Sequence, residues 1–78
     1  MTNIQLRKKR IEEVLQMVRE CSDRNTPCDE NKLIAHCMYK FGYTKRILEE
    51  YLAILRMAEQ IEDKADGLWI KNALSPLQ

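Results

Sequence analysis

Three stretches of the chain repeat apolar residues at the three- and four-residue spacing of an amphipathic helix. The first spans residues 4–21, the second residues 33–41 and the third residues 45–61. In the first and third stretches charged and polar residues fall on the face opposite the apolar stripe. This pattern predicts three helices, each with one face buried.

Capping residues mark the ends of the second and third helices. Asp29 precedes the second helix, and Gly42 follows it at a position where a left-handed C-cap is favoured. Thr44 is suited to cap the third helix. The connection from Gly42 to Thr44 is only about three residues long, which forces a sharp angle between the two helices. The sequence therefore predicts a helix-turn-helix.

The periodicity changes after the third helix. Residues 61–64 and residues 68–71 flank an Ala-Asp-Gly sequence at 65–67, where Asp-Gly favours a hairpin turn. A short extended segment is also expected around residues 26–28, in a region rich in turn-forming residues. The predicted fold is therefore α+β and mainly helical, with three helices followed by a two-stranded β-hairpin.

Length and composition narrow the class of protein. Seventy-eight residues provide one domain, predicted at 1–71 with a C-terminal tail at 72–78, and leave no room for a separate cofactor domain. Most enzyme classes are therefore excluded, and we expect no enzymatic activity. Because 13 Lys and Arg balance 12 Asp and Glu, only the distribution of charge can indicate an anionic partner. The absence of a long apolar run predicts a cytoplasmic protein without a membrane partner.

Three helices with a tight Gly42-Tyr43-Thr44 turn and a following hairpin resemble the winged helix-turn-helix domains of transcriptional regulators, particularly the small archaeal kind. The likeness covers roughly residues 8–71 and is densest over residues 41–55, which resemble the turn and the recognition helix. In that family the third helix enters the major groove of DNA and the hairpin, or wing, contacts the backbone or minor groove. The resemblance thus implies a sequence-specific, double-stranded DNA-binding regulator that needs no cofactor.

The exposed face of the third helix supplies the candidate DNA-contacting residues. They are Thr44, Lys45, Arg46, Glu49, Ala53 and Arg56. Lys and Arg bind phosphates or guanine edges, while Ala53 permits close approach and Glu49 can accept from cytosine N4. On the wing, Lys64 and Lys71 are predicted to reach phosphates. An ordinary solvated helix surface is the alternative interpretation, favoured by the repulsion of phosphate by Glu49 and Glu50.

One run of like charge lies near the start of the first helix. It consists of Arg7, Lys8, Lys9 and Arg10. The run is suited to bind phosphates as a basic arm. Lys8 with Glu12, and Lys9 with Glu13, also have the i,i+4 spacing of ordinary helix-surface ion pairs. The sequence leaves both interpretations open.

Three cysteines and one histidine are possible zinc ligands, because thiolates and imidazoles together can complete a tetrahedral zinc site. The candidate ligands are Cys21, Cys28, His36 and Cys37. Their spacing argues against such a site, because Cys21 and Cys37 lie on apolar helical stripes and resemble small core residues. Three cysteines without a C-x-x-C pair also fit a reducing compartment. We therefore expect folding without metal or disulfides.

A protein-interaction module is the main alternative function. Ile47, Ile54 and Ile61 share the broad apolar face of the third helix and are candidates for a dimer or partner surface, as is the long first helix. A core of this size is also only marginally stable, and operators are commonly two-fold symmetric. A homodimer, formed through the first helix or the tail, is therefore expected.

Overall fold

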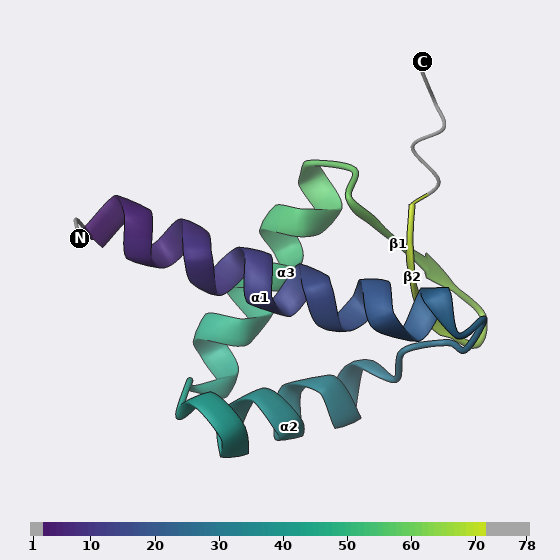
Figure 1. Cartoon of the computed structure of the whole chain (residues 1–78), viewed down its shortest axis with the longest axis horizontal. Coiled ribbons are helices and arrows are strands. Elements are labelled where there is room, and N and C mark those ends of the chain that lie inside the picture. Colours follow the sequence, from purple (N-terminus) through teal and green to yellow (C-terminus); the bar gives the residue numbers. More distant parts are fainter. Residues whose placement is uncertain (1–2, 72–78) are drawn as a thin grey trace.

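Three helices and then an antiparallel hairpin make up the computed structural model, which describes residues 3–71 (Figure 1). The elements are α1 (Asn3–Asp23), α2 (Glu30–Phe41), α3 (Lys45–Met57), β1 (Ile61–Lys64) and β2 (Gly67–Ile70). This is the predicted α+β fold, with the arrangement of a winged helix-turn-helix. The predicted tail at 72–78 lies outside the described residues. Within residues 3–71, no helix combines the length and the apolar character needed to cross a membrane.

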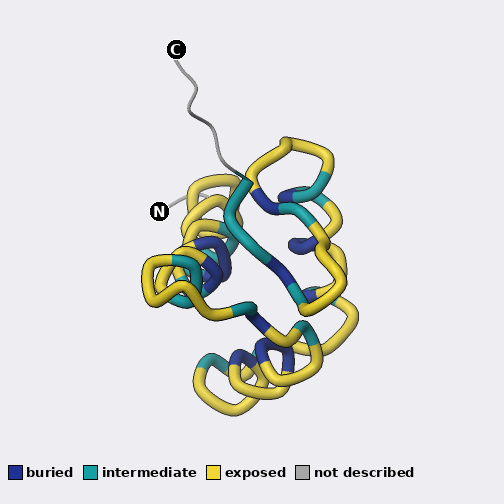
Figure 2. Tube along the Cα trace, turned by 90° about the vertical axis from the view of Figure 1, so that its right-hand side faces the viewer, coloured by how far each residue is buried: buried dark blue, intermediate teal, exposed yellow. Residues whose placement is uncertain are grey.

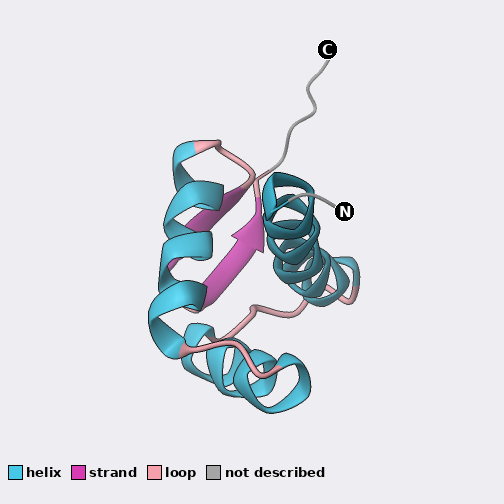
Figure 3. Ribbon diagram, turned by 90° about the vertical axis from the view of Figure 1, so that its left-hand side faces the viewer, coloured by secondary structure: helices cyan, strands magenta, loops and turns pink. Residues whose placement is uncertain are grey.

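The core lies between the helices and the hairpin. Figure 3 shows the two strands between α3 and α1, and the packing is of β1 against α3 and of β2 against α1. Buried residues of all these elements face one another across this space (Figure 2). The largest fully buried side chains are Leu48, Leu52, Leu68, Val14, Val18 and Cys37. One face of α3 is thereby fixed in the core and the opposite face is left to solvent.

The capping predictions for the helix-turn-helix are confirmed. Asp29 accepts a hydrogen bond from the Lys32 amide at the start of α2. Gly42 ends α2 in the left-handed conformation, with φ of 75°. The Thr44 hydroxyl accepts from the Ile47 amide and caps α3. Because these caps satisfy backbone groups locally, they fix where α3 begins.

A short extended segment at Cys28 pairs with β2 of the hairpin through an isolated antiparallel bridge. Ile61 pairs with Ile70 and Lys64 with Gly67, which leaves Ala65 and Asp66 as the turn. The second strand therefore spans 67–70 rather than the predicted 68–71, because Gly67 pairs with Lys64 instead of lying in the turn. The backbone of Cys28 exchanges two hydrogen bonds with Leu68, with N···O distances of 3.0 and 2.8 Å. The extended segment predicted at 26–28 is therefore confirmed, and it ties the start of α2 to the hairpin.

The third helix ends earlier than its apolar pattern predicts. Its last residue is Met57, and Glu59 follows in the left-handed region with φ of 58°. The Gln60 amide donates to the Leu55 carbonyl and closes the helix end. Ile61 consequently belongs to β1 and is 2% exposed.

That early end overturns one predicted surface. Ile61 lies in the core, and the partly buried Ile47 side chain packs against the core cluster. The apolar band of Ile47, Ile54 and Ile61 is therefore not a free dimer surface, because the chain leaves the helical path before Ile61 and folds that residue inward.

Candidate nucleic-acid interface

The outward face of α3 carries most of the predicted DNA-contacting residues. Lys45, Arg46, Glu49 and Ala53 are exposed, whereas Leu48, Tyr51, Leu52 and Leu55 anchor the other face in the core. Lys45 and Arg46 directly follow the Thr44 cap, so they lie in the first turn. The amino end of a helix carries a partial positive charge that adds to these two cations.

Positive charge on this face is concentrated at its amino end. Within residues 3–71, neither Lys45 nor Arg46 forms an ion pair. Glu49 and Glu50 follow one turn later, and Glu50 is occupied by Arg7 of α1 at 2.8 Å. The first turn of α3 is therefore a free, exposed cationic end, while one of the two nearby carboxylates is already neutralised.

The basic run of α1 lies next to α3. Arg7 forms the ion pair with Glu50, and the Arg10 guanidinium lies 5.3 Å from the centroid of the Tyr43 ring. Lys8 and Lys9 are exposed, and neither forms an ion pair within the described chain. The i,i+4 pairs with Glu12 and Glu13 that the sequence allows are thus not formed, which leaves two lysines available to an anionic partner.

Tyr43 fixes the turn before α3 to α1. Its hydroxyl donates to the Glu13 carboxylate at 2.8 Å. Its ring stacks on Phe41 and meets Tyr51 edge-on, with centroids 5.2 and 6.2 Å apart. Burial and the hydrogen bond to Glu13 raise the pKa of Tyr43 to about 12. These contacts hold the basic run of α1 in a defined position beside the amino end of α3.

The Tyr43 contact predicts a dependence of stability on alkaline pH. Because the pKa of Tyr43 is higher in the folded chain than its usual value, its contribution is complete below about pH 10 and is lost as the pH rises towards about 12. We expect Tyr43→Phe to flatten this part of the curve of unfolding free energy against pH, measured with urea. Tyr39→Phe, at a ring 92% exposed, is the control and keeps the wild-type curve. Equal curves for wild type and Tyr43→Phe would mean that the hydrogen bond from Tyr43 to Glu13 does not stabilise the fold.

Arg56 is held inside the domain by two carboxylates. Its guanidinium contacts Glu30 at 2.6 Å and binds both carboxylate oxygens of Asp63 at 2.9 Å. The side chain is only 31% exposed and joins α2, α3 and β1. A contact between Arg56 and DNA, as predicted from the sequence, would have to displace these partners.

The hairpin is less basic than its two predicted lysines indicate. Lys71 pairs with Glu59 at 2.8 Å, and the Lys64 ammonium lies 5.3 Å from the centroid of the Trp69 ring. The strands and turn also carry acidic residues, namely Glu62, Asp63 and Asp66. Asp63 is paired with Arg56, but Glu62 and Asp66 form no ion pair within residues 3–71 and repel a phosphate that approaches Lys64.

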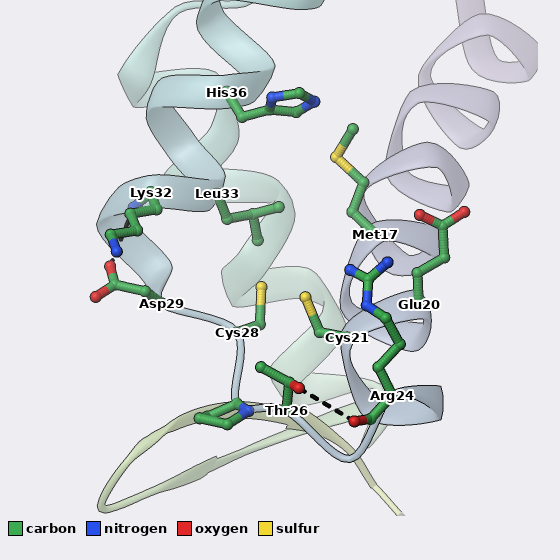
Figure 4. Close-up of a pocket in the computed structure, with 11 residues that line it drawn as sticks. Met17, Glu20, Cys21, Arg24, Thr26, Cys28, Asp29, Lys32, Leu33 and His36 are labelled. Carbon is green, nitrogen blue, oxygen red and sulfur yellow. Dashed lines mark hydrogen bonds between the residues drawn. The ribbon is translucent and has the colours of Figure 1, made fainter.

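The structure does not bring all four residues of the zinc hypothesis to one site. Cys21, Cys28 and His36 line a pocket of about 420 Å³ between α1 and α2 (Figure 4). Cys37 lies in the core, where its thiol donates to the Met17 sulfur at 3.4 Å. Within residues 3–71, no group of three or more Cys, His, Asp or Glu side chains has an arrangement that could hold a metal ion.

Comparison of the chain with known protein families, with curated proteins and with solved structures finds no match. Function is therefore inferred from the fold and the surface of this chain. Because one fold class serves many functions, the fold alone does not define the function of this chain. The exposed charged residues of α1 and α3 are therefore the basis of the functional argument.

Proposed function

We propose that this chain is a sequence-specific, double-stranded DNA-binding protein and a transcriptional regulator, with the amino end of α3 in the major groove. One observation supports this most strongly. Lys45 and Arg46 are exposed and free of ion pairs within the described residues, in the first turn of a helix whose other face is anchored in the core. Arginine and lysine at such a position bind guanine O6 and N7. The rigid helix fixes the register of these contacts.

The shape of the α3 face is compatible with close approach to a groove. The major groove of B-DNA admits an α-helix. Ala53 lies on the exposed face two turns after Lys45 and Arg46, and its small side chain does not obstruct the groove. Glu49 lies between them and can accept a hydrogen bond from cytosine N4. An acidic residue at this position favours some base pairs over others, which supports sequence-specific binding.

The proposal assigns the main backbone contacts to Lys8 and Lys9 of α1. Both are exposed, and neither has an intramolecular ion pair among residues 3–71. Their neighbours Arg7 and Arg10 hold this part of α1 against α3 and the turn. Lys64 has the lesser role, because its ammonium lies over the Trp69 ring and the same hairpin carries the acidic residues Glu62 and Asp66. Phosphate contacts of this kind set affinity and orientation without specifying sequence.

Replacing Lys8 and Lys9 together by glutamine should weaken binding to all duplexes alike. Loss of two phosphate contacts is expected to reduce the slope of log K against log salt concentration by about two, because each contact contributes about 0.9. Lys64→Gln is the matched control, and we expect it to change the slope by less than one unit. Fluorescence anisotropy of a labelled duplex, titrated between about 50 and 200 mM salt, measures both slopes.

The outcomes separate the parts of the proposal. A larger effect of Lys64→Gln than of the double variant would assign the backbone contacts to the hairpin. Absence of duplex binding by the wild-type protein even at low salt would overturn DNA binding itself.

No catalytic step, cofactor or small-molecule substrate is part of this proposal. Its proposed setting is the cytoplasm, which suits the three free thiols of Cys21, Cys28 and Cys37. Binding to a two-fold symmetric operator would require a homodimer, which is also proposed.

A protein-interaction module is the second candidate function, and exposed apolar side chains favour it. Tyr39 on α2, Met57 at the end of α3 and Ile4 near the start of α1 are 92%, 84% and 80% exposed. Tyrosine and methionine are enriched at protein interfaces. Self-association that persists after Lys45 and Arg46 are replaced, together with failure to bind any duplex, would favour this candidate.

A further inference from the structure

Two thiols meet in the pocket between α1 and α2. Cys21 projects from the last turn of α1, and Cys28 projects from the extended segment that precedes α2. The two sulfur atoms lie next to one another in Figure 4, and Cys21 is among the neighbouring groups that raise the pKa of Cys28. Both cysteines are free. The pocket therefore contains two neighbouring free thiols that the proposed DNA-binding face does not use.

The backbones of both cysteines are held in place. The Thr26 amide donates to the Cys21 carbonyl at 2.9 Å, so the chain turns back towards the end of α1. The backbone of Cys28 is fixed to Leu68 of the hairpin by two hydrogen bonds. Because neither residue lies at a chain end or in an unpaired loop, the proximity of the two thiols is a property of the fold.

The two thiols differ in access to solvent. Cys21 is partly exposed at the pocket, whereas Cys28 is 5% exposed. Burial, with the neighbouring Cys21, raises the pKa of Cys28 to about 12, so this thiol stays protonated at neutral pH. A soluble reagent therefore meets Cys21 first, and Cys28 is positioned to react second.

The third cysteine is excluded from this pair. Cys37 is fully buried, and its thiol donates to the Met17 sulfur. It is absent from the lining of the pocket that holds Cys21 and Cys28. Oxidation of the native fold is therefore directed to one pairing out of three.

We propose that Cys21 and Cys28 form a redox-active dithiol, which a low-molecular-weight disulfide such as oxidised glutathione converts to an intramolecular disulfide. The Cys21 thiolate attacks one glutathione sulfur, forms a mixed disulfide and releases one glutathione thiolate. The Cys28 sulfur, on losing its proton, attacks the Cys21 sulfur and releases the second glutathione. The protein loses two electrons and two protons, and oxidised glutathione is reduced to two thiols.

The disulfide links elements that the fold already brings together. It joins the last turn of α1 to the Cys28–Leu68 bridge, and β2 packs against α1. Oxidation thus fixes the hairpin to α1 on the side of the domain that carries the pocket. This inference does not depend on DNA binding, and its test does not involve DNA.

Tryptic peptides of the intact, oxidised chain test the proposal directly. Trypsin cleaves after Arg19, Arg24 and Lys32, so residues 20–24 carry Cys21 and residues 25–32 carry Cys28. After incubation with oxidised glutathione and blocking of free thiols, we expect these two peptides to be joined by a disulfide. The peptide 33–40, which carries Cys37, should be recovered blocked and unlinked. Dithiothreitol should release the joined pair.

Two variants and a denatured control make each outcome decisive. Cys37→Ser is expected to form the same linked peptides, whereas Cys21→Ser, at the more exposed position, should form none and should keep the wild-type circular dichroism spectrum. Oxidation in urea should give a mixture of pairings. The proposal would be overturned by native linkage to Cys37, by disulfides only between chains, or by free Cys21 and Cys28 under conditions that oxidise the denatured chain.

Discussion

Gly67→Ala is expected to lower the free energy of unfolding by about 3 kcal/mol. Gly67 has φ of 145°, a conformation that side-chain-bearing residues rarely adopt. An added Cβ would lie 2.8 Å from the Cys28 carbonyl oxygen and 3.2 Å from its carbonyl carbon. These are main-chain atoms, so relief of the clash requires Cys28 to move away from Leu68 and weaken their two hydrogen bonds. Urea unfolding followed by circular dichroism measures the loss.

The other glycine of the chain provides a matched control. Gly42 also has positive φ, at 75°, but an added Cβ would meet no atom within 4 Å. Gly42→Ala should therefore cost only the left-handed backbone penalty, about 1 to 2 kcal/mol. If Gly67→Ala costs no more than Gly42→Ala, the close approach of Gly67 to Cys28 is wrong.

Arg46→Ala is expected to weaken binding to the preferred duplex by about 1 to 3 kcal/mol, roughly 5- to 150-fold. Arg46 is exposed in the first turn of α3, where the guanidinium can donate two hydrogen bonds to one guanine. Loss of a base contact also relaxes the preference at that base pair. Binding to unrelated duplexes should fall less. Competition between preferred and mixed duplexes, at fixed salt concentration, measures both effects.

Replacing an arginine outside α3 serves as a control, because it removes one positive charge without removing a predicted base contact. Arg24 is exposed in the turn after α1 and lines the pocket between α1 and α2. Arg24→Ala should reduce affinity only slightly and leave the sequence preference unchanged. Equal losses for Arg24→Ala and Arg46→Ala, without a change in preference, would mean that α3 does not recognise bases.

The features that the sequence predicts correctly depend on residues that are close together in the chain. The caps at Asp29, Gly42 and Thr44 each depend on atoms within four residues, so they are visible in a short window. The hairpin is similar, because the Asp66-Gly67 pair predicts a turn within one residue of the actual one, Ala65-Asp66. Fold class and the exposed face of α3 follow from these local features combined with the apolar spacing.

Contacts between distant residues could not be predicted in the same way. Arg56 lies on the polar side of its helix in the sequence pattern, yet it is held by Glu30 and by Asp63 across the fold. The bond between Tyr43 and Glu13 spans 30 residues. No spacing rule relates such positions, so the partners of these side chains emerge only when the helices pack.

The apolar pattern does not predict the end of α3, for a different physical reason. Helices commonly end at a glycine, but here Glu59 takes the left-handed conformation, which is unusual for a residue with a side chain. The apolar spacing also continues to Ile61, because that residue is needed in the core as part of β1. A periodic pattern alone therefore extends the helix too far.

The most direct test of DNA binding by α3 is a nuclear magnetic resonance titration of the isotope-labelled chain with a mixed-sequence duplex at low salt. The account predicts that the largest changes in amide chemical shift occur at Lys45 and Arg46, with smaller changes at Lys8 and Lys9. Unchanged spectra, or changes confined to the exposed face of α2 around Tyr39, would contradict it.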